Sequence, residues 1–199
     1  MRIEDIETPA VLIDLDLVEA NIARAQAIFD QLGKSFRPHI KTHKIPYLAR
    51  LQMKAGAIGI ACQKISEAEV FAADGFDDIL LCFNLLSPAK IARARVLAEA
   101  GVLSTVADNA ETIAALAKGM AGSTVPLRVL VECDTGMGRC GVQSPQQALE
   151  LARLVAGSAG LVFGGLMTYP KPDAETQVEA FFSAARDLIV AELGSCPVI

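Results

Sequence analysis

The sequence is poor in the residues from which zinc sites and disulfide frameworks are built. Its 199 residues include only two histidines, and its five cysteines are odd in number and form no CxxC pair. We therefore expect neither a structural zinc site nor a disulfide framework. The cysteines are predicted to be buried thiols that pack as small apolar side chains.

Long apolar runs and long basic runs are also missing. No stretch of about 18 apolar residues occurs, so no transmembrane helix is expected. Residues 1–5 lack the apolar core of a signal peptide, which predicts a cytoplasmic protein. The net charge of −5 gives no electrostatic reason to expect a nucleic-acid partner. With 52% hydrophobic and 21% charged residues, the composition is typical of a globular protein with a sizeable core.

Common catalytic and nucleotide-binding motifs are absent as well. The sequence has no GxSxG, no HExxH, no paired-carboxylate signature and no phosphate-loop motif. A GxGxxG fingerprint does not follow the first predicted strand, which argues against a doubly wound dinucleotide-binding fold.

What the sequence does contain is an alternation of short apolar runs with helical segments. Such runs, apolar almost throughout, are typical of parallel strands that are buried on both faces. We predict strands over residues 10–14, 36–41, 57–62, 78–83, 102–107, 127–134 and 161–169.

Helix-start signals fill the gaps between these runs. Capping-box patterns and prolines at the first helical position mark the starts. They are Asp16 with Glu19, Ser66 with Glu69, Ser87-Pro88, Asp108 with Glu111, and Ser144-Pro145 with Gln147, and a last helix is predicted over residues 174–193.

The repeated strand–helix units predict an α/β fold with a parallel sheet. Alternation alone is compatible with an open six-stranded sheet and with a TIM-type (β/α)8 barrel. Six strands follow from residue 36 onward, and residues 197–199 resemble the start of a seventh. A closed barrel typically needs about 250 residues, so a barrel would be incomplete in this chain.

The first core strand ends in a cluster of basic residues, Arg37-Pro38-His39-Ile40-Lys41-Thr42-His43-Lys44. Alternation along a strand places Arg37, His39 and Lys41 on one face. A lysine at such a position is a candidate for forming a Schiff base with a carbonyl compound. The alternative is an ordinary solvated basic loop.

Further candidates lie at other strand ends, which meet at one rim in barrels and open α/β sheets alike. Gln63 follows the third predicted strand, and Asp134 and Arg139 flank a glycine-rich loop after the sixth. Arg139 can pair with a phenolate or carboxylate, and Tyr169 can stack on a flat ring. The ordinary alternative for Gln63 is a helix start, for Asp134 and Arg139 a turn with a local ion pair, and for Tyr169 a core residue.

Four segments together resemble the D-threonine aldolase and D-serine dehydratase group of fold-type III pyridoxal-phosphate (PLP) enzymes, whose barrel is that of alanine racemase. RPHxKTHK and DTGMGRxG are the segments specific to that group, and the four occur in its order over nearly the whole chain. They are Thr8-Pro9-Ala10 with Asp14-Leu15-Asp16, residues 37–44, residues 63–69 and residues 134–142.

The resemblance implies that residues 1–199 form one PLP-binding TIM-type barrel domain. Lys41 looks like the Schiff-base lysine, and Lys44 is the less favoured candidate. Arg139 is placed near the phenolic oxygen of the cofactor, and Tyr169 is placed against its ring. The implied pocket residues are His39 and Gln63 for the cofactor, and Arg37 and His39 for the substrate.

The resemblance also implies a small amino-acid substrate, and it favours retro-aldol cleavage of D-3-hydroxy amino acids over a D-serine dehydratase-like elimination. The family's phosphate-binding Ser-Gly-Gly loop and its C-terminal β domain, which carries a divalent metal, have no counterpart in the sequence, so no metal ligand is assigned. A homodimer is expected for the full-length form. Two alternatives stay open: a PLP-binding barrel without turnover, and a Lys41 that acts on a carbonyl substrate without any cofactor.

Overall fold

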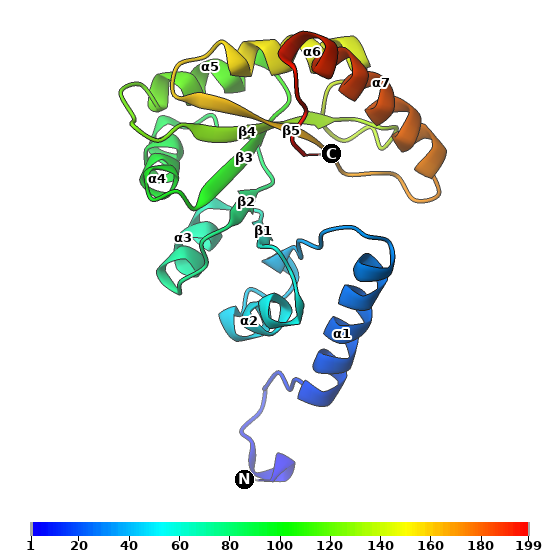
Figure 1. The fold of residues 1–199 in the computed structure, drawn as a ribbon. Coiled ribbons are helices and arrows are strands. Elements are labelled where there is room, and N and C mark those ends of the chain that lie inside the picture. The colour runs from blue at the N-terminus through cyan, green and yellow to red at the C-terminus, as the bar shows by residue number, and fades with distance from the viewer. Residues whose placement is uncertain (1, 199) are drawn as a thin grey trace.

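Five parallel strands form a single sheet in the computed structural model, which describes residues 2–198 (Figure 1). The strands are hydrogen-bonded in the order in which they occur along the chain, without the reversal that a doubly wound sheet requires. Their bounds are β1 Ile60–Cys62, β2 Ile79–Leu81, β3 Leu103–Ala107, β4 Leu127–Cys133 and β5 Leu161–Thr168.

The helices that alternate with these strands cover one face of the sheet (Figure 1). They are α3 Ile65–Ala73, α4 Pro88–Glu99, α5 Ala110–Gly119, α6 Pro145–Ala156 and α7 Glu175–Leu193. Fully buried strand residues such as Ile60, Ile79 and Val129 form the core together with Ile113 of α5. Helices on one face and sequential strand order are the features of a barrel wall, and they exclude the doubly wound alternative.

The sheet continues beyond β1 and β5. The carbonyl oxygens of Phe36 and Pro38 accept hydrogen bonds from Ile58 N–H (2.9 Å) and Ala61 N–H (2.8 Å). At the other edge, Val198 O accepts from Leu166 N–H at 2.8 Å. The described chain therefore has six strand positions and the first contact of a seventh, as the sequence predicts.

The first predicted core strand, 36–41, is shorter than expected. It is reduced to one parallel bridge between His39 and Ala61, after which the 3₁₀ turn η2 Ile40–Thr42 begins. Pro38 has no N–H to donate to a ladder, which shortens the pairing on this segment.

The predicted strand over residues 10–14 was wrong. The segment has no strand partner within residues 2–198, and Val11 is 92% exposed. A short η1 helix, Ile3–Asp5, precedes it, and α1, Leu15–Gln31, follows it. Asp14, rather than Asp16, caps α1 by accepting a hydrogen bond from Leu17 N–H at 3.1 Å. The next helix, α2, spans Pro46–Ala55 and packs against α1 (Figure 1).

The other helix starts agree with prediction except for two caps. α4 and α6 begin at Pro88 and Pro145, as predicted. At α3, Glu67 instead of Glu69 accepts from the backbone amides ahead of the helix. At α5, Asn109 caps the helix instead of Asp108, whose carboxylate is thereby left for other partners.

The five cysteines are all free thiols. Cys62 and Cys133 are buried, and burial raises the pKa of each to about 12, so both stay protonated at neutral pH. The prediction of apolar packing is thus met at these two positions. Within residues 2–198, no helix combines the length and the apolar character needed to cross a membrane.

Candidate active site

Lys41 lies in the short turn that follows the bridge between His39 and Ala61. Ile40 is completely buried and anchors this turn to the core, while the Lys41 side chain is half-buried. The Nδ1 atom of His39 accepts a hydrogen bond from the backbone N–H of Lys41 at 3.2 Å. The buried side chain of Ile40 and the imidazole of His39 therefore both fix the position of the Lys41 backbone.

The glycine-rich loop after β4 brings Arg139 to the same rim. Asp134 Oδ1 accepts from the N–H groups of Gly136 (2.9 Å) and Gly138 (3.0 Å), which folds the loop back on itself. Gly141 then leads into a bridge between Cys133 and Val142. These glycines have GxGxxG spacing, but they close a loop and do not open a helix directly, so the spacing is no dinucleotide fingerprint here.

The two cations meet at the ring of Tyr169, directly after β5. Arg139 Cζ lies 4.7 Å from the ring centroid, and Lys41 Nζ lies 5.9 Å from it. Thr168 fixes the end of β5, because its hydroxyl donates to Cys133 O at 2.7 Å and lies 3.0 Å from the hydroxyl of buried Thr135. Three residues far apart in sequence thus share one half-exposed site.

Asp108 holds the rim loops together. Its Oδ1 accepts from Asn84 Nδ2 at 2.8 Å and from Asn109 Nδ2 at 2.6 Å, and its Oδ2 accepts from Gly141 N–H at 3.2 Å. One carboxylate therefore links the loops after β2, β3 and β4. We predicted Asp108 only as a helix-start residue. Its position directly after a strand was the signal for this second role.

The two lysines of the first motif have different surroundings. Lys44 forms an ion pair with Glu67, whose side chain is only 9% exposed. Burial pushes the pKa of Glu67 upward, but the bonds from Lys44 and from the amides of Gln63 and Lys64 outweigh it, and the pKa is lowered. Lys41 has no carboxylate within ion-pair distance among residues 2–198, so it is the lysine left free for chemistry.

His39 is held in its neutral form at neutral pH. Burial and the charge of Lys41 lower the pKa of the imidazole, while the neighbouring Gln63 and Glu67 oppose the shift. Its Nε2 atom is buried and has no hydrogen-bond partner in the described part of the chain. Gln63 is thus a neighbour of the His39 imidazole, because it opposes the lowering of its pKa.

A second buried acid, Glu132, was not singled out from the sequence. It lies on β4 and is 5% exposed, and Cys140 donates a hydrogen bond to its carboxylate at 3.0 Å. Burial raises the pKa of Glu132, and nearby Asp108 adds to the shift. Its sequence neighbours are apolar, so only the structure reveals the pairing.

Arg37 is not at this rim. Its guanidinium donates to Asp78 Oδ2 at 2.8 Å and to Asp78 O at 3.1 Å, at the amino end of β2. Alternation predicts that Arg37 and Lys41 share one face, but the extended segment ends at the bridge of His39, and Lys41 lies in the 3₁₀ turn that follows. The predicted contact of Arg37 with a substrate is therefore not supported.

Comparisons with known proteins identify the family of the chain. The family described as alanine racemase, N-terminal domain, matches residues 13–196. The chain belongs to the alanine racemase N-terminal domain family. A D-threonine aldolase from Arthrobacter sp is 39% identical over 164 residues, which are 82% of this chain and 43% of that relative. A D-threo-3-hydroxyaspartate dehydratase from Delftia sp. (strain HT23) is 35% identical over 166 residues, with shares of 82% and 43%.

Among solved structures, a D-threonine aldolase from Filomicrobium marinum superposes with a TM-score of 0.87 at 32% identity. The match covers 94% of this chain and 55% of that one. The chain thus spans about half the length of the relatives that it matches. Membership of the alanine racemase N-terminal domain family confirms the barrel architecture, which in this chain is an unclosed barrel wall.

Proposed function

We propose that the protein is a PLP-dependent lyase that acts on D-3-hydroxy amino acids, most directly by retro-aldol cleavage to glycine and an aldehyde. The observation that carries the proposal is the convergence of Lys41 and Arg139 on the Tyr169 ring at 5.9 and 4.7 Å. The relatives named as D-threonine aldolase and 3-hydroxy-D-aspartate aldolase support the aldol reaction.

The residues of the site fit the reactive end of PLP, which has an aldehyde next to a phenolic oxygen on a flat ring. Lys41, which forms no ion pair among residues 2–198, would hold the aldehyde carbon covalently through its side-chain nitrogen. Arg139 is a cation suited to the phenolic oxygen, and Tyr169 offers a planar surface. The Nε2 atom of His39, next to Lys41, is buried and has no hydrogen-bond partner among residues 2–198, as is expected of a polar atom that binds a ligand.

When bound, PLP supplies an electron sink for the charge that develops at the substrate Cα. The residues of the chain hold the reacting groups in position. His39 holds the backbone of Lys41, so that the lysine amine stays at the rim and can take or return a proton at Cα. Asp108 and Glu132 hold the loop that carries Arg139.

The test is a product analysis with PLP and D-threonine. Retro-aldol cleavage yields glycine and acetaldehyde, whereas the dehydratase alternative yields a keto acid and ammonia. We expect glycine and acetaldehyde, and at least about a hundredfold loss of turnover in Lys41→Ala but not in Lys118→Ala, since Lys118 is an exposed residue in the last turn of α5. Keto acid and ammonia in place of glycine would assign the protein to the dehydratases, of which the Delftia enzyme is a relative.

We further propose that residues 1–199 act as one barrel domain, in a cytoplasmic protein that assembles as a homodimer. The support for a subunit contact is the exposed apolar segment Val11-Leu12-Ile13, because exposed apolar clusters mark contact surfaces. Light scattering coupled to gel filtration measures the assembly, and a monomer at all concentrations would contradict it.

A further inference from the structure

The imidazole of His39 is engaged at one nitrogen and left free at the other. His39 is the N-cap of η2, where its Nδ1 atom accepts a hydrogen bond from Lys41 N–H at 3.2 Å. A ring nitrogen that accepts a hydrogen bond carries no proton, and in a neutral imidazole the proton is then on the other nitrogen. The cap of η2 therefore makes Nε2 the N–H donor of His39.

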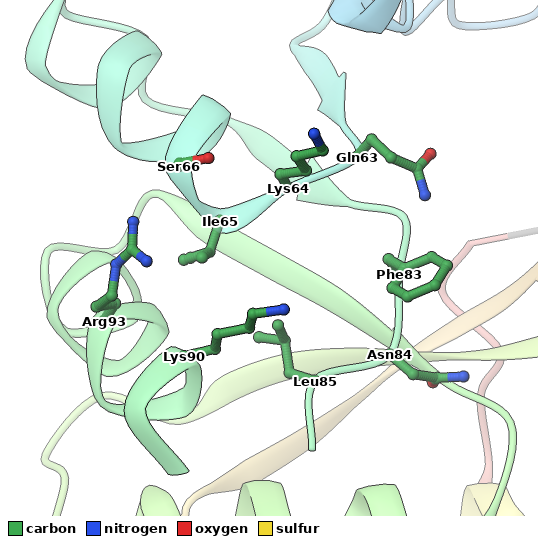
Figure 2. A pocket seen from close by; sticks show the side chains of 9 residues that line it. All are labelled: Gln63, Lys64, Ile65, Ser66, Phe83, Asn84, Leu85, Lys90 and Arg93. Carbon is green, nitrogen blue, oxygen red and sulfur yellow. The ribbon is translucent and has the colours of Figure 1, made fainter. Parts of the chain in front are cut away.

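This donor has no acceptor within residues 2–198, although its Nε2 atom is buried. The Gln63 amide raises the pKa of the imidazole from nearby, yet it forms no hydrogen bond with Nε2. Gln63 lines the pocket between α3 and α4, and Figure 2 shows its amide directed away from Ser66 and Arg93 of those helices. A buried N–H group without an acceptor is unfavourable, so a ligand that supplies the acceptor gains affinity from it.

The donor lies in the field of both cations of the candidate active site. Burial lowers the pKa of the imidazole most, the positive charge of Lys41 lowers it further, and Arg139 adds to the shift. Gln63 and the charge of Glu67 act in the opposite direction, and the net shift is downward. A negatively charged acceptor is therefore favoured at Nε2, because the two cations attract it and hydrogen bonds to charged acceptors are the stronger ones.

We propose that His39 binds an anionic oxygen of the ligand at Lys41 through Nε2–H, and that it exchanges no proton during the reaction. The oxygen belongs either to the carboxylate of the amino-acid substrate or to the phosphate of PLP, and this choice of ligands rests on the proposed function. Neither ring nitrogen is available as a base, because Nδ1 faces an N–H group and Nε2 already carries the proton. Proton transfer at the substrate Cα is thus left to Lys41.

His43 offers a matched control in the same segment. Its Nδ1 atom accepts from Ile45 N–H at 3.0 Å, and its buried Nε2 atom has no hydrogen-bond partner within the described chain. Burial lowers its pKa as well, but the groups that oppose the shift are Gln52 and Ile45, and no charged group of the site acts on it. His43 therefore has the same expected tautomer as His39 without the cations beside it.

The first test reads the tautomer and needs neither cofactor nor turnover. Nitrogen NMR of isotope-labelled protein distinguishes protonated from unprotonated ring nitrogens, and the chain has only two histidines. His43→Asn leaves the signals of His39 alone, so the assignment does not depend on a variant of His39. We expect a proton on Nε2 and none on Nδ1 at neutral pH. A proton on Nδ1, or on both nitrogens, would overturn the proposal.

The second test asks whether the acceptor is the substrate carboxylate. Asparagine at position 39 keeps an oxygen that can accept from Lys41 N–H but has no group at the place of Nε2, so His39→Asn removes the donor alone. D-Alanine has no hydroxyl for retro-aldol cleavage, and D-alaninol lacks the carboxylate. A carboxylate acceptor predicts that His39→Asn weakens D-alanine about tenfold or more and leaves D-alaninol unchanged, as followed by the visible spectrum of the PLP-loaded protein.

The same variant tests the phosphate. A phosphate acceptor predicts that His39→Asn weakens PLP about tenfold or more and leaves pyridoxal, which lacks the phosphate, unchanged. Melting curves verify that each variant is folded, and His43→Asn should leave all four affinities unchanged. Equal weakening within both pairs of ligands, no weakening of any ligand, or the same losses in His43→Asn would overturn the anion assignment.

The pH profile of turnover separates this inference from the proposed function. With D-threonine as the substrate, the wild type and His39→Asn should show the same ionisations in kcat/KM. An ionisation near neutral pH that is present in the wild type and absent from His39→Asn would make His39 the base and overturn the proposal, while aldol cleavage stands. The expected tautomer and the expected affinity differences without any cleavage of D-threonine would overturn the proposed function alone.

Discussion

Arg37 at the amino end of the strands differs from Lys41 and Arg139 at the carboxyl end in the partners that each cation has. At the amino end, Arg37 is tied to the Asp78 carboxylate and to two backbone carbonyl oxygens. At the carboxyl end, Lys41 and Arg139 have no acidic partner within ion-pair distance among residues 2–198, and both lie near the ring of Tyr169. The difference shows that the first end is satisfied within the chain, whereas the second has charge to offer to a ligand.

The largest effect is expected from two glycine substitutions, one at each end. Gly141 has φ +111°, and an added Cβ would lie 2.4 Å from Asp134 N. Gly141→Ala should therefore cost about 1–3 kcal/mol of stability and also displace Arg139. At Gly59 a Cβ would meet Arg37 Nη1 at 2.2 Å and Asp78 O at 2.6 Å, so Gly59→Ala should cost about 1–3 kcal/mol as well.

The two variants should differ in cofactor binding. Chemical denaturation gives the stability, and titration with PLP gives the affinity. We expect Gly59→Ala to bind PLP like the wild type, measured well below its melting temperature, and Gly141→Ala to bind it at least about tenfold more weakly. Equal loss of affinity in both would remove the distinction between the two ends.

A second pair of variants, with smaller expected effects, replaces the arginine at each end with methionine. Arg139→Met should lower PLP affinity about tenfold and leave the free energy of unfolding nearly unchanged, because Arg139 is exposed. Arg37→Met should do the reverse, with a loss of about 1–2 kcal/mol and unchanged affinity, because Asp78 loses its partner. Titration with PLP and chemical denaturation of both variants would show whether Arg139→Met loses affinity alone and Arg37→Met loses stability alone.

Variants of Asp108 test how the loops at the carboxyl end are held in position. Asp108→Ala removes the acceptor for Asn84, Asn109 and Gly141 N–H, and should reduce both stability, by about 1–2 kcal/mol, and PLP affinity. Asp108→Asn keeps one oxygen to accept from Gly141, so PLP affinity should recover in large part. Failure of the asparagine to restore affinity would speak against a positioning role.

The smallest effect concerns pH and two buried acids of the carboxyl end. The pKa of Glu67 is lowered in the folded protein, so its stabilisation is present above the unfolded pKa of about 4.3 and is lost as the pH falls through the folded value. Glu67→Gln should therefore lose about 1 kcal/mol or less at neutral pH, and the difference from the wild type should shrink in acid.

Glu132 should behave with the opposite sign. Its pKa is raised, so the charged form is disfavoured in the folded state at neutral pH. Glu132→Gln is expected to be more stable than the wild type at neutral pH, and its advantage should fade as the pH falls and Glu132 becomes protonated. Denaturation curves from neutral to acid pH for both variants check the two signs.

Most of the architecture could be predicted because parallel strands have a strong apolar signal. The segments over β3, β4 and β5 and the helix starts at Ser87-Pro88 and Ser144-Pro145 were correctly located. The segment 10–14 has the same apolar character but no neighbouring strand among residues 2–198, and pairing cannot be read from one segment alone.

The candidate site could be predicted in part. Lys41, Arg139 and Tyr169 each follow a strand, and the carboxyl ends of parallel strands meet at one rim. Arg37 was misplaced because alternation gives the face of a residue but not its height along the strand. The rim roles of Asp108 and Glu132 depend on partners 33 and 8 residues away, so they required the three-dimensional structure.

The most direct test of the central claim is to incubate the protein with PLP, reduce it with borohydride and map the labelled peptide. We predict one pyridoxyl group, on Lys41, with a visible absorbance band before reduction, and loss of both in Lys41→Ala. Labelling of Lys44 instead, or labelling spread over surface lysines without a band, would contradict the assignment of Lys41 and with it the proposed function.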